Sequence, residues 1–209
     1  MALGGKKIMW IYEKKLEFPV DIKKPNAKIA SVIISQLGGP DGEMGAATRY
    51  LSQRYTMPIN MGKAMLTDIG TEELGHEEMV STLVYQLTQG LTIEEIKEQG
   101  YDKYFVDHTL GIYPQAASGV PFSAATLQST GDPIADLFED LAAEQKARVT
   151  YDNILRLVDD EDVCKVIYFL REREIVHFQR FGDILTKTQE TLNGKNYYAF
   201  NPAFDRQAK

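Results

Sequence analysis

One pattern of residues occurs twice in this chain, and it limits the possible folds more than any other feature of the sequence. Glu73 stands three residues before His76, and Glu174 stands three residues before His177. On an α-helix, a spacing of three places both side chains on one face. If both segments are helical, each Glu-x-x-His pair directs a carboxylate and an imidazole at one point.

The repetition extends beyond these two pairs. A further glutamate precedes each pair by 30 residues, at Glu43 and at Glu144. A single offset of 101 residues relates the two pairs, the two preceding glutamates, and Tyr50 to Tyr151. This regularity indicates an internal duplication of a helical hairpin. Each half would contribute one Glu from its first helix and one Glu-x-x-His pair from its second.

The apolar pattern predicts the helices that such a duplication requires. They cover residues 26–37, 40–56, 61–89, 132–158 and about 159–192. Gly38-Gly39 is a plausible left-handed end for the first helix, and Pro40 is expected in the first turn of the next. Asp132 is expected to cap the helix that follows it, and the acidic run at 159–162 suits the positive end of the last helix.

The connection between the two hairpins is unusually long. Loops between bundle helices usually have two to eight residues, whereas residues 90–131 form a crossover of about 40. Two helical hairpins joined by one long crossover are the ferritin-like form of the four-helix bundle. We therefore expect an all-α fold with a ferritin-like bundle at 26–192. An extended N-terminal segment at 1–25 would precede it, and a tail at 193–209 would follow it.

A short strand is predicted ahead of the helices. Apolar residues alternate with other residues from Leu16 to Ile22, which is the period of a strand with one buried face. Pro19 lies inside this run and has no amide hydrogen to donate. The strand should therefore lie at an edge or form an isolated ribbon.

The repeated residues match the ligands of a two-metal carboxylate centre in a bundle core. Four carboxylates facing one another in a core would repel and resist ionisation, and two divalent or trivalent cations would remove that cost. The mixture of carboxylates and imidazoles suits manganese or iron. By spacing alone, the candidate ligands are Glu43, Glu73, His76, Glu144, Glu174 and His177.

Other residues give weaker indications. Tyr50 and Tyr151 each lie two helical turns after a candidate glutamate, where they would either donate hydrogen bonds to the site or pack in the core. His108 has no partner at ligand spacing, and Cys164 lies among apolar residues that predict a place in the core. Arg148 follows Glu144 by one turn and is either a charge partner of that carboxylate or a surface residue.

Composition excludes several classes of protein. The 209 residues carry 23 Lys+Arg and 30 Asp+Glu, a net charge of −7, which argues against a nucleic-acid partner. No apolar run approaches the roughly 20 residues that span a bilayer, and the N-terminus does not resemble a secretory signal. The single cysteine cannot form an intrachain disulfide. Synthesis in the cytoplasm, without a membrane or nucleic-acid partner, is the resulting expectation.

The sequence resembles the manganese catalases and, within them, the short CotJC-type spore-coat proteins. The matching segments span most of the chain, from Met9 to about Leu192. They are MWIYEKKLEFPVDIKKPN, GGPDGEM, RYLSQRYTMP, DIGTEELGHEEM, DLAAEQKARVTYDNIL and REREIVHFQRF.

This resemblance implies two manganese ions per chain, with hydrogen peroxide as the substrate that is converted to water and dioxygen. It implies that Glu73 bridges the two ions and that Glu174 accepts and donates protons near the bridging solvent rather than acting as a firm ligand. The manganese ligands would be Glu43, Glu73, His76, Glu144 and His177. The family forms hexamers, so the resemblance also implies a homo-oligomer.

Three alternatives remain open at the level of the sequence. A di-iron peroxidase or ferroxidase would use nearly the same ligands, so iron is the alternative metal. A structural spore-coat protein, in contact with other coat proteins, would keep a vestigial or purely stabilising metal site. A bundle without any metal would leave four carboxylates in a core with nothing to neutralise them.

Overall fold

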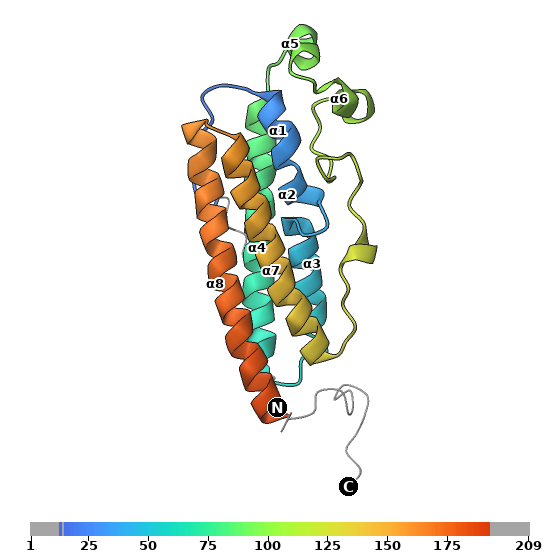
Figure 1. Ribbon diagram of the computed structural model, residues 1–209, viewed down its shortest axis with the longest axis vertical. Coiled ribbons are helices and arrows are strands. Elements are labelled where there is room, and N and C mark those ends of the chain that lie inside the picture. Colours follow the sequence, from blue (N-terminus) through green and yellow to red (C-terminus); the bar gives the residue numbers. More distant parts are fainter. Residues whose placement is uncertain (1–12, 14, 193–209) are drawn as a thin grey trace, which may run out of the picture.

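The computed structural model describes residue 13 and residues 15–192. Three long helices run side by side along its length, and shorter helices placed end to end form a fourth row (Figure 1). The long helices are α4 (Asn60–Thr88), α7 (Pro133–Leu157) and α8 (Glu161–Thr191), and the fourth row consists of α1 (Ala27–Ile33), α2 (Ser35–Gly38) and α3 (Glu43–Gln53). The predicted all-α bundle is confirmed. The tail at 193–209 lies outside the described residues.

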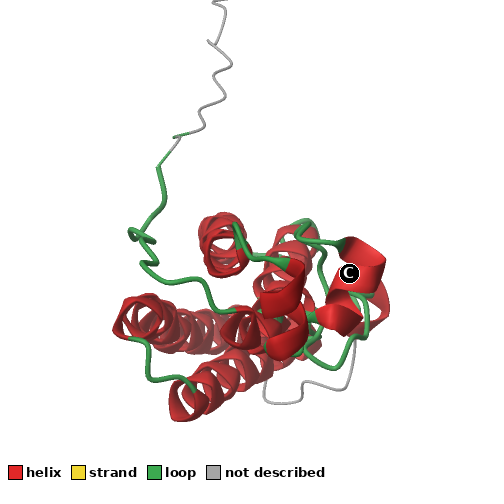
Figure 2. Cartoon of the chain, turned by 90° about the horizontal axis from the view of Figure 1, so that it is seen from above, coloured by secondary structure: helices red, strands yellow, loops and turns green. Residues whose placement is uncertain are grey.

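The two hairpins of the predicted duplication are present. Helix α3 packs most extensively on α4, and α7 packs most extensively on α8. Seen from above and coloured by secondary structure, the described residues form helices and loops but no strand (Figure 2). Among them, no helix combines the length and the apolar character needed to cross a bilayer.

The second hairpin begins where its sequence predicts. The Asp132 carboxylate accepts hydrogen bonds from the amides of Ile134 and Ala135, and Pro133 occupies the first helical position. The Asp160 carboxylate likewise accepts hydrogen bonds from the amides at the start of α8. These side chains satisfy amides that have no partner within the helix, so they define both N-termini.

The first hairpin departs from its prediction. The helix expected at 26–37 is divided between α1 and α2, and Pro40 does not open the next helix. It lies instead in a turn, in which the Gly42 amide donates to the Gly39 carbonyl at 3.1 Å. A Cβ on Gly42 would lie 2.7 Å from the Gln36 carbonyl oxygen, so the chain folds back closely over α2. Helix α3 therefore begins only at Glu43, which becomes its first residue.

The predicted strand at Leu16–Ile22 is wrong. Strand pairing needs a neighbouring extended chain, whereas the backbone of this segment forms its hydrogen bonds with the side of helix α4. The Gln86 side chain of α4 takes the place of a strand partner, because it accepts from the Ile22 amide at 2.7 Å and donates to the Val20 carbonyl at 3.0 Å. The alternation still marks the inward face, since Val20 and Ile22 are buried.

The crossover at 90–131 contains local structure that periodicity did not predict. It holds α5 (Ile93–Glu98), α6 (Asp102–His108) and a 3₁₀ turn at Ala124–Thr126, and it descends beside the fourth row (Figure 1). The Thr92 side chain accepts from the Glu95 amide, and the Glu95 carboxylate accepts from the Thr92 amide. This capping box was the available signal for α5.

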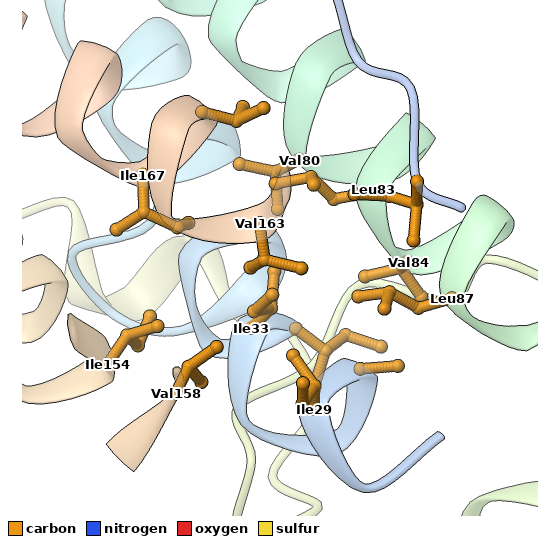
Figure 3. Packing of buried hydrophobic residues seen from close by; sticks show 14 of the residues in the cluster. Ile29, Ile33, Val80, Leu83, Val84, Leu87, Ile154, Val158, Val163 and Ile167 are labelled. Carbon is orange, nitrogen blue, oxygen red and sulfur yellow. The ribbon is translucent and has the colours of Figure 1, made fainter. Parts of the chain in front are cut away.

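Two apolar clusters pack the bundle, one toward each end. Along α4, the smaller cluster ends at Ile69 and the larger cluster begins at Met79. The residues between these two positions form a polar layer that separates the clusters. Ile33, Leu83 and Val163 belong to the larger cluster (Figure 3). The repeated Glu and His positions fall in this interval, between two regions that exclude water.

We expect Gly38→Ala to destabilise the fold, because a Cβ at Gly38 would lie 2.2 Å from backbone atoms of Pro114 and Gln115. Moving the crossover backbone away should cost about 1–3 kcal/mol. Gly182→Ala on α8 is the matched control, because a Cβ there meets no heavy atom within 4 Å. It should gain up to about 1 kcal/mol from helix propensity. Urea unfolding of both variants tests this, and a Gly38→Ala protein as stable as the parent would contradict it.

Candidate metal centre

The repeated acidic and imidazole side chains meet in the polar layer of the bundle. Glu43 comes from α3, Glu144 from α7, and the two Glu-x-x-His pairs from α4 and α8. All of these side chains are buried. They form two overlapping groups whose ligand atoms lie within 4.8 Å of one another; one is Glu43, Glu73, His76 and Glu174, and the other is Glu73, Glu144, Glu174 and His177.

Glu73 lies between the two imidazoles. Its Oε2 is 2.8 Å from Nδ1 of His76, and its Oε1 is 2.7 Å from Nδ1 of His177. The two imidazole rings are nearly parallel, with centroids 5.6 Å apart. A carboxylate that reaches both rings in this way is placed to be shared between two metal ions.

A second glutamate accompanies each imidazole. Oε2 of Glu43 lies 3.8 Å from Nδ1 of His76, and Oε2 of Glu144 lies 3.5 Å from Nδ1 of His177. Each half-site therefore has one glutamate and one histidine of its own in addition to the shared Glu73. The inner Nδ1 atoms, rather than the outer Nε2 atoms, face these carboxylates.

Glu174 belongs to both groups. It is buried, and its Oε1 has no hydrogen-bond partner among the described residues. Its position agrees with the symmetry of the spacing, in which Glu174 corresponds to Glu73. Glu174 is therefore close enough to the other carboxylates to act either as a ligand or as a proton carrier.

The electrostatics of the layer follow from burial and mutual repulsion. Burial and the neighbouring Glu73 raise the pKa of Glu43 to about 8, against the opposing effect of His76. Burial, followed by the charges of Glu144 and Glu43, raises the pKa of Glu174 well above its usual value. Without a metal, both carboxylates therefore keep their protons to a higher pH than an exposed glutamate does.

Glu73 behaves differently because two imidazoles adjoin it. Burial alone would raise its pKa, but the charges of His177 and His76 outweigh burial and lower it. Burial would lower the pKa of His177, yet Glu73 and the other surrounding carboxylates raise it to about 12. In the metal-free protein, the cationic imidazoles thus occupy the electrostatic role that metal cations would take.

The donor atoms fit a pair of metal ions. Within the described part of the chain, Oε1 of Glu174 has no hydrogen-bond partner, and Glu73 Oε1 and Glu144 Oε2 lie at ion-pair distance from His177 Nδ1 in a geometry that forms no hydrogen bond. Buried polar atoms without partners are costly, and metal coordination would satisfy them. Carboxylate oxygens and imidazole nitrogens are ligands for first-row metals such as manganese and iron.

The two repeated tyrosines contact the site crosswise. Tyr50 of the first half donates its hydroxyl to Glu144 of the second, and Tyr151 of the second half donates to Glu43 of the first. Both tyrosines are fully buried and belong to the apolar clusters. The two alternatives left open by the sequence are therefore both realised, because each ring packs in the core while its hydroxyl orients a carboxylate.

The weaker candidates lie away from the centre. His108 stacks on Tyr113 within the crossover, with ring centroids 3.9 Å apart. Arg148 forms an ion pair with Asp152 at 2.6 Å. Its charge partner is therefore Asp152 and not Glu144. Cys164 is partly buried and packs against the larger apolar cluster.

Two acidic residues near the centre were missed by the sequence reasoning. Asp140 lies one turn before Glu144 and is fully buried, and burial raises its pKa well above the usual value against the opposing effects of Gln53 and Arg49. Glu72 precedes Glu73 and lies near the outer nitrogens of both imidazoles. The signal for Glu72 was present, because the same offset of 101 residues relates it to Arg173, its ion-pair partner.

We expect the metal-free protein to lose stability as the pH rises from about 4.5 to about 8. Glu43 and His177 bind protons more tightly in the folded chain than in the unfolded chain, since their pKa values are raised from 4.5 to about 8 and from 6.5 to about 12. Their contribution is complete below the unfolded pKa and declines above it. Urea unfolding across this range, with chelator, measures the effect.

The stabilisation by added manganese(II) should grow over the same pH range. Metal ions replace the protons on the carboxylates, so binding strengthens as those protons become easier to release. Parallel unfolding curves with manganese(II) test this. A metal-free protein that becomes steadily more stable between pH 4.5 and 8 would contradict the protonation scheme.

Comparisons with known proteins agree with this geometry. The family model for manganese-containing catalases matches residues 9–207. Protein CotJC of Bacillus subtilis is 47% identical over 190 residues, which cover 91% of this chain and 100% of CotJC. A probable manganese catalase of Clostridium acetobutylicum is 34% identical over 191 residues, covering 90% of this chain and 85% of the relative.

A solved structure shows the same fold. KatB, a manganese catalase from Anabaena, superposes with a TM-score of 0.80 at 29% sequence identity, covering 96% of this chain and 87% of KatB. The resemblance identified from the sequence is thereby confirmed over nearly the whole chain. This protein belongs to the family of manganese-containing catalases.

Proposed function

We propose that this protein is a dimanganese catalase, which converts two molecules of hydrogen peroxide into two molecules of water and one of dioxygen. The observation that carries the proposal is the convergence of two imidazoles on the single carboxylate of Glu73, with a further buried glutamate beside each imidazole. Membership of the manganese catalase family supports the choice of metal and reaction.

Each half of the duplication would hold one ion. Glu43 and His76 would bind the first ion, Glu144 and His177 the second, and Glu73 would bridge them. When bound, the two manganese ions supply the exchange of two electrons with peroxide, so that neither half-reaction has to release a radical. The protein residues then have to orient the ligands, exclude water and move protons.

Glu174 is our candidate for the proton-transferring residue. Oxidation of peroxide to dioxygen releases two protons, and reduction of a second peroxide to water consumes two. The Glu174 carboxylate would accept one of these two protons in the first half-reaction and return it in the second, and the other proton would be exchanged with solvent. Its unpartnered Oε1 and its place in both groups of candidate ligands favour this role, because a proton carrier has to lie beside the reacting centre with an oxygen free to take up the proton.

The remaining residues keep the centre ordered and dry. Tyr50 and Tyr151 would hold the carboxylates of Glu144 and Glu43 in position through their hydroxyl groups. The apolar clusters above and below the polar layer exclude bulk water. Electrostatic interactions are stronger in such surroundings, so small changes of charge at the centre carry more energy.

A second role is favoured by the similarity to CotJC. Because the identity is 47% over the full length of that protein, we propose that this chain also assembles into the spore coat together with other coat proteins. The two roles are compatible, since a coat component can keep its catalytic centre. The hexamers of the family make a homo-oligomer the proposed state of assembly.

The metal content should be about two manganese ions per chain when the protein is produced with manganese and purified without chelator. Such protein should release dioxygen from hydrogen peroxide. Elemental analysis and an oxygen electrode provide the measurements. Iron in place of manganese would redirect the proposal to a di-iron peroxidase or ferroxidase, and a folded protein without metal would favour a structural coat protein.

We expect Glu73→Ala or His177→Ala to lose metal and activity together, because each removes a ligand that the layer cannot replace. Glu174→Gln should retain the metal but lower turnover by about 10²–10⁴-fold, the usual contribution of a general acid or base. Glu172→Gln, on the same helix with a largely exposed side chain, is the matched control.

Two results for Glu174→Gln would change the assignment. Full activity would contradict the proton-transferring role. Loss of one or both metal ions would instead identify Glu174 as a sixth ligand, as the symmetry of the spacing suggests.

A further inference from the structure

The outer nitrogens of the two imidazoles face carboxylates that are not part of the proposed ligand set. Nε2 of His177 lies 3.2 Å from Oε2 of Glu72, and Nε2 of His76 lies 3.7 Å from Oε1 of the same residue. Glu72 thus reaches both rings from the side opposite to Glu73. Glu73 thus contacts the inner nitrogens of both imidazoles, and Glu72, its neighbour in the sequence, contacts the outer nitrogens.

Glu72 is held in this position from the facing helix. Nε of Arg173 donates to Oε1 of Glu72 at 2.6 Å, and Arg180 approaches its other oxygen at 4.0 Å. Glu72 and Arg173 are 101 residues apart, so they occupy equivalent positions of the two halves. The contact between Glu72 and Arg173 places Glu72 between the two halves, where it reaches both histidines.

A second outer carboxylate is present on one side of the centre. Oε2 of Glu17 lies 3.5 Å from Nε2 of His76. The N-terminal segment brings it there, and the adjacent Phe18 stacks on Phe169 of α8 with ring centroids 4.8 Å apart. Among the described residues, the outer nitrogen of His177 has Glu72 alone within ion-pair distance. The two halves therefore differ at this point, because Glu17, from the segment that precedes the bundle, contacts His76 but not His177.

We propose that Glu72 is a positioning residue for both metal-binding histidines, and that Glu17 reinforces His76 alone and makes the two metal positions unequal. This inference rests on the proposed metal centre. At the observed ion-pair distances, a carboxylate stabilises a proton on the outer nitrogen of a histidine; this favours one ring orientation and leaves the inner nitrogen free to bind metal. Without it, the ring can turn or the proton can move to the nitrogen that faces the metal.

Titration of the metal-free protein with manganese(II), followed by the signal of the free ion in electron paramagnetic resonance, tests the proposal. Loss of an outer carboxylate usually lowers metal affinity by about 10–100-fold. Glu72→Gln should lower the affinity for both ions by such a factor. Glu17→Gln should lower the affinity for only one ion, and the other ion should bind as tightly as in the parent protein. The control Glu172→Gln should bind both ions normally.

Arg173→Gln separates positioning from a merely structural ion pair. It removes the partner of Glu72 but keeps the carboxylate beside both imidazoles. We therefore expect a smaller loss of affinity than in Glu72→Gln, although both variants lose the same ion pair. Equal losses in the two variants would overturn the proposal. Thermal unfolding of each metal-free variant verifies that the fold is retained.

The outcomes distinguish this inference from the proposed function. A parent protein that binds no manganese would contradict the proposed function itself. A parent protein that binds two ions, with Glu72→Gln binding both equally well, would leave that function intact and overturn the positioning role. If Glu17→Gln lowered the affinity for both ions equally, the proposal that Glu17 makes the two metal positions unequal would be overturned.

Discussion

The structure depends on the placement of four glutamates and two histidines in one buried layer. Such a layer is unfavourable in a bare core, because desolvation and mutual repulsion oppose the charged carboxylates. The charges are arranged around Glu73, which both imidazoles approach and whose pKa is lowered while those of Glu43 and Glu174 are raised. Two metal cations would neutralise the same carboxylates more strongly, and the buried Glu and His side chains are consistent with a dinuclear metal site.

The duplication explains how one chain supplies this layer. Each half provides the same residue types. Several side chains of one half form hydrogen bonds or ion pairs with the site residues of the other half. Tyr50 donates to Glu144, Tyr151 donates to Glu43, and Glu72 pairs with Arg173. Separating the two hairpins would therefore remove the support of both half-sites. The symmetry is incomplete, since Glu17 of the N-terminal segment approaches only His76.

Errors in the prediction arose where the chain leaves regular periodicity. The alternation at Leu16–Ile22 identified an inward face correctly, but a strand needs a partner and the chain offers Gln86 of a helix instead. Pro40 suits a first helical turn in isolation, yet close packing of Gly42 on α2 delays the helix to Glu43. The short helices of the crossover lack an amphipathic pattern long enough to detect, and only the capping box at Thr92 marks one of them.

The sequence by itself determined the all-α bundle, its long helices and the set of residues that meet in the polar layer. Helical periodicity and a constant offset are local or pairwise properties, so they can be recognised without coordinates. Only the tertiary structure decided that Glu73 lies between the imidazoles, that the tyrosines act crosswise, and that Glu72 and Glu17 face the outer nitrogens. These relations depend on how helices distant in sequence pack and rotate against one another, which no local pattern specifies.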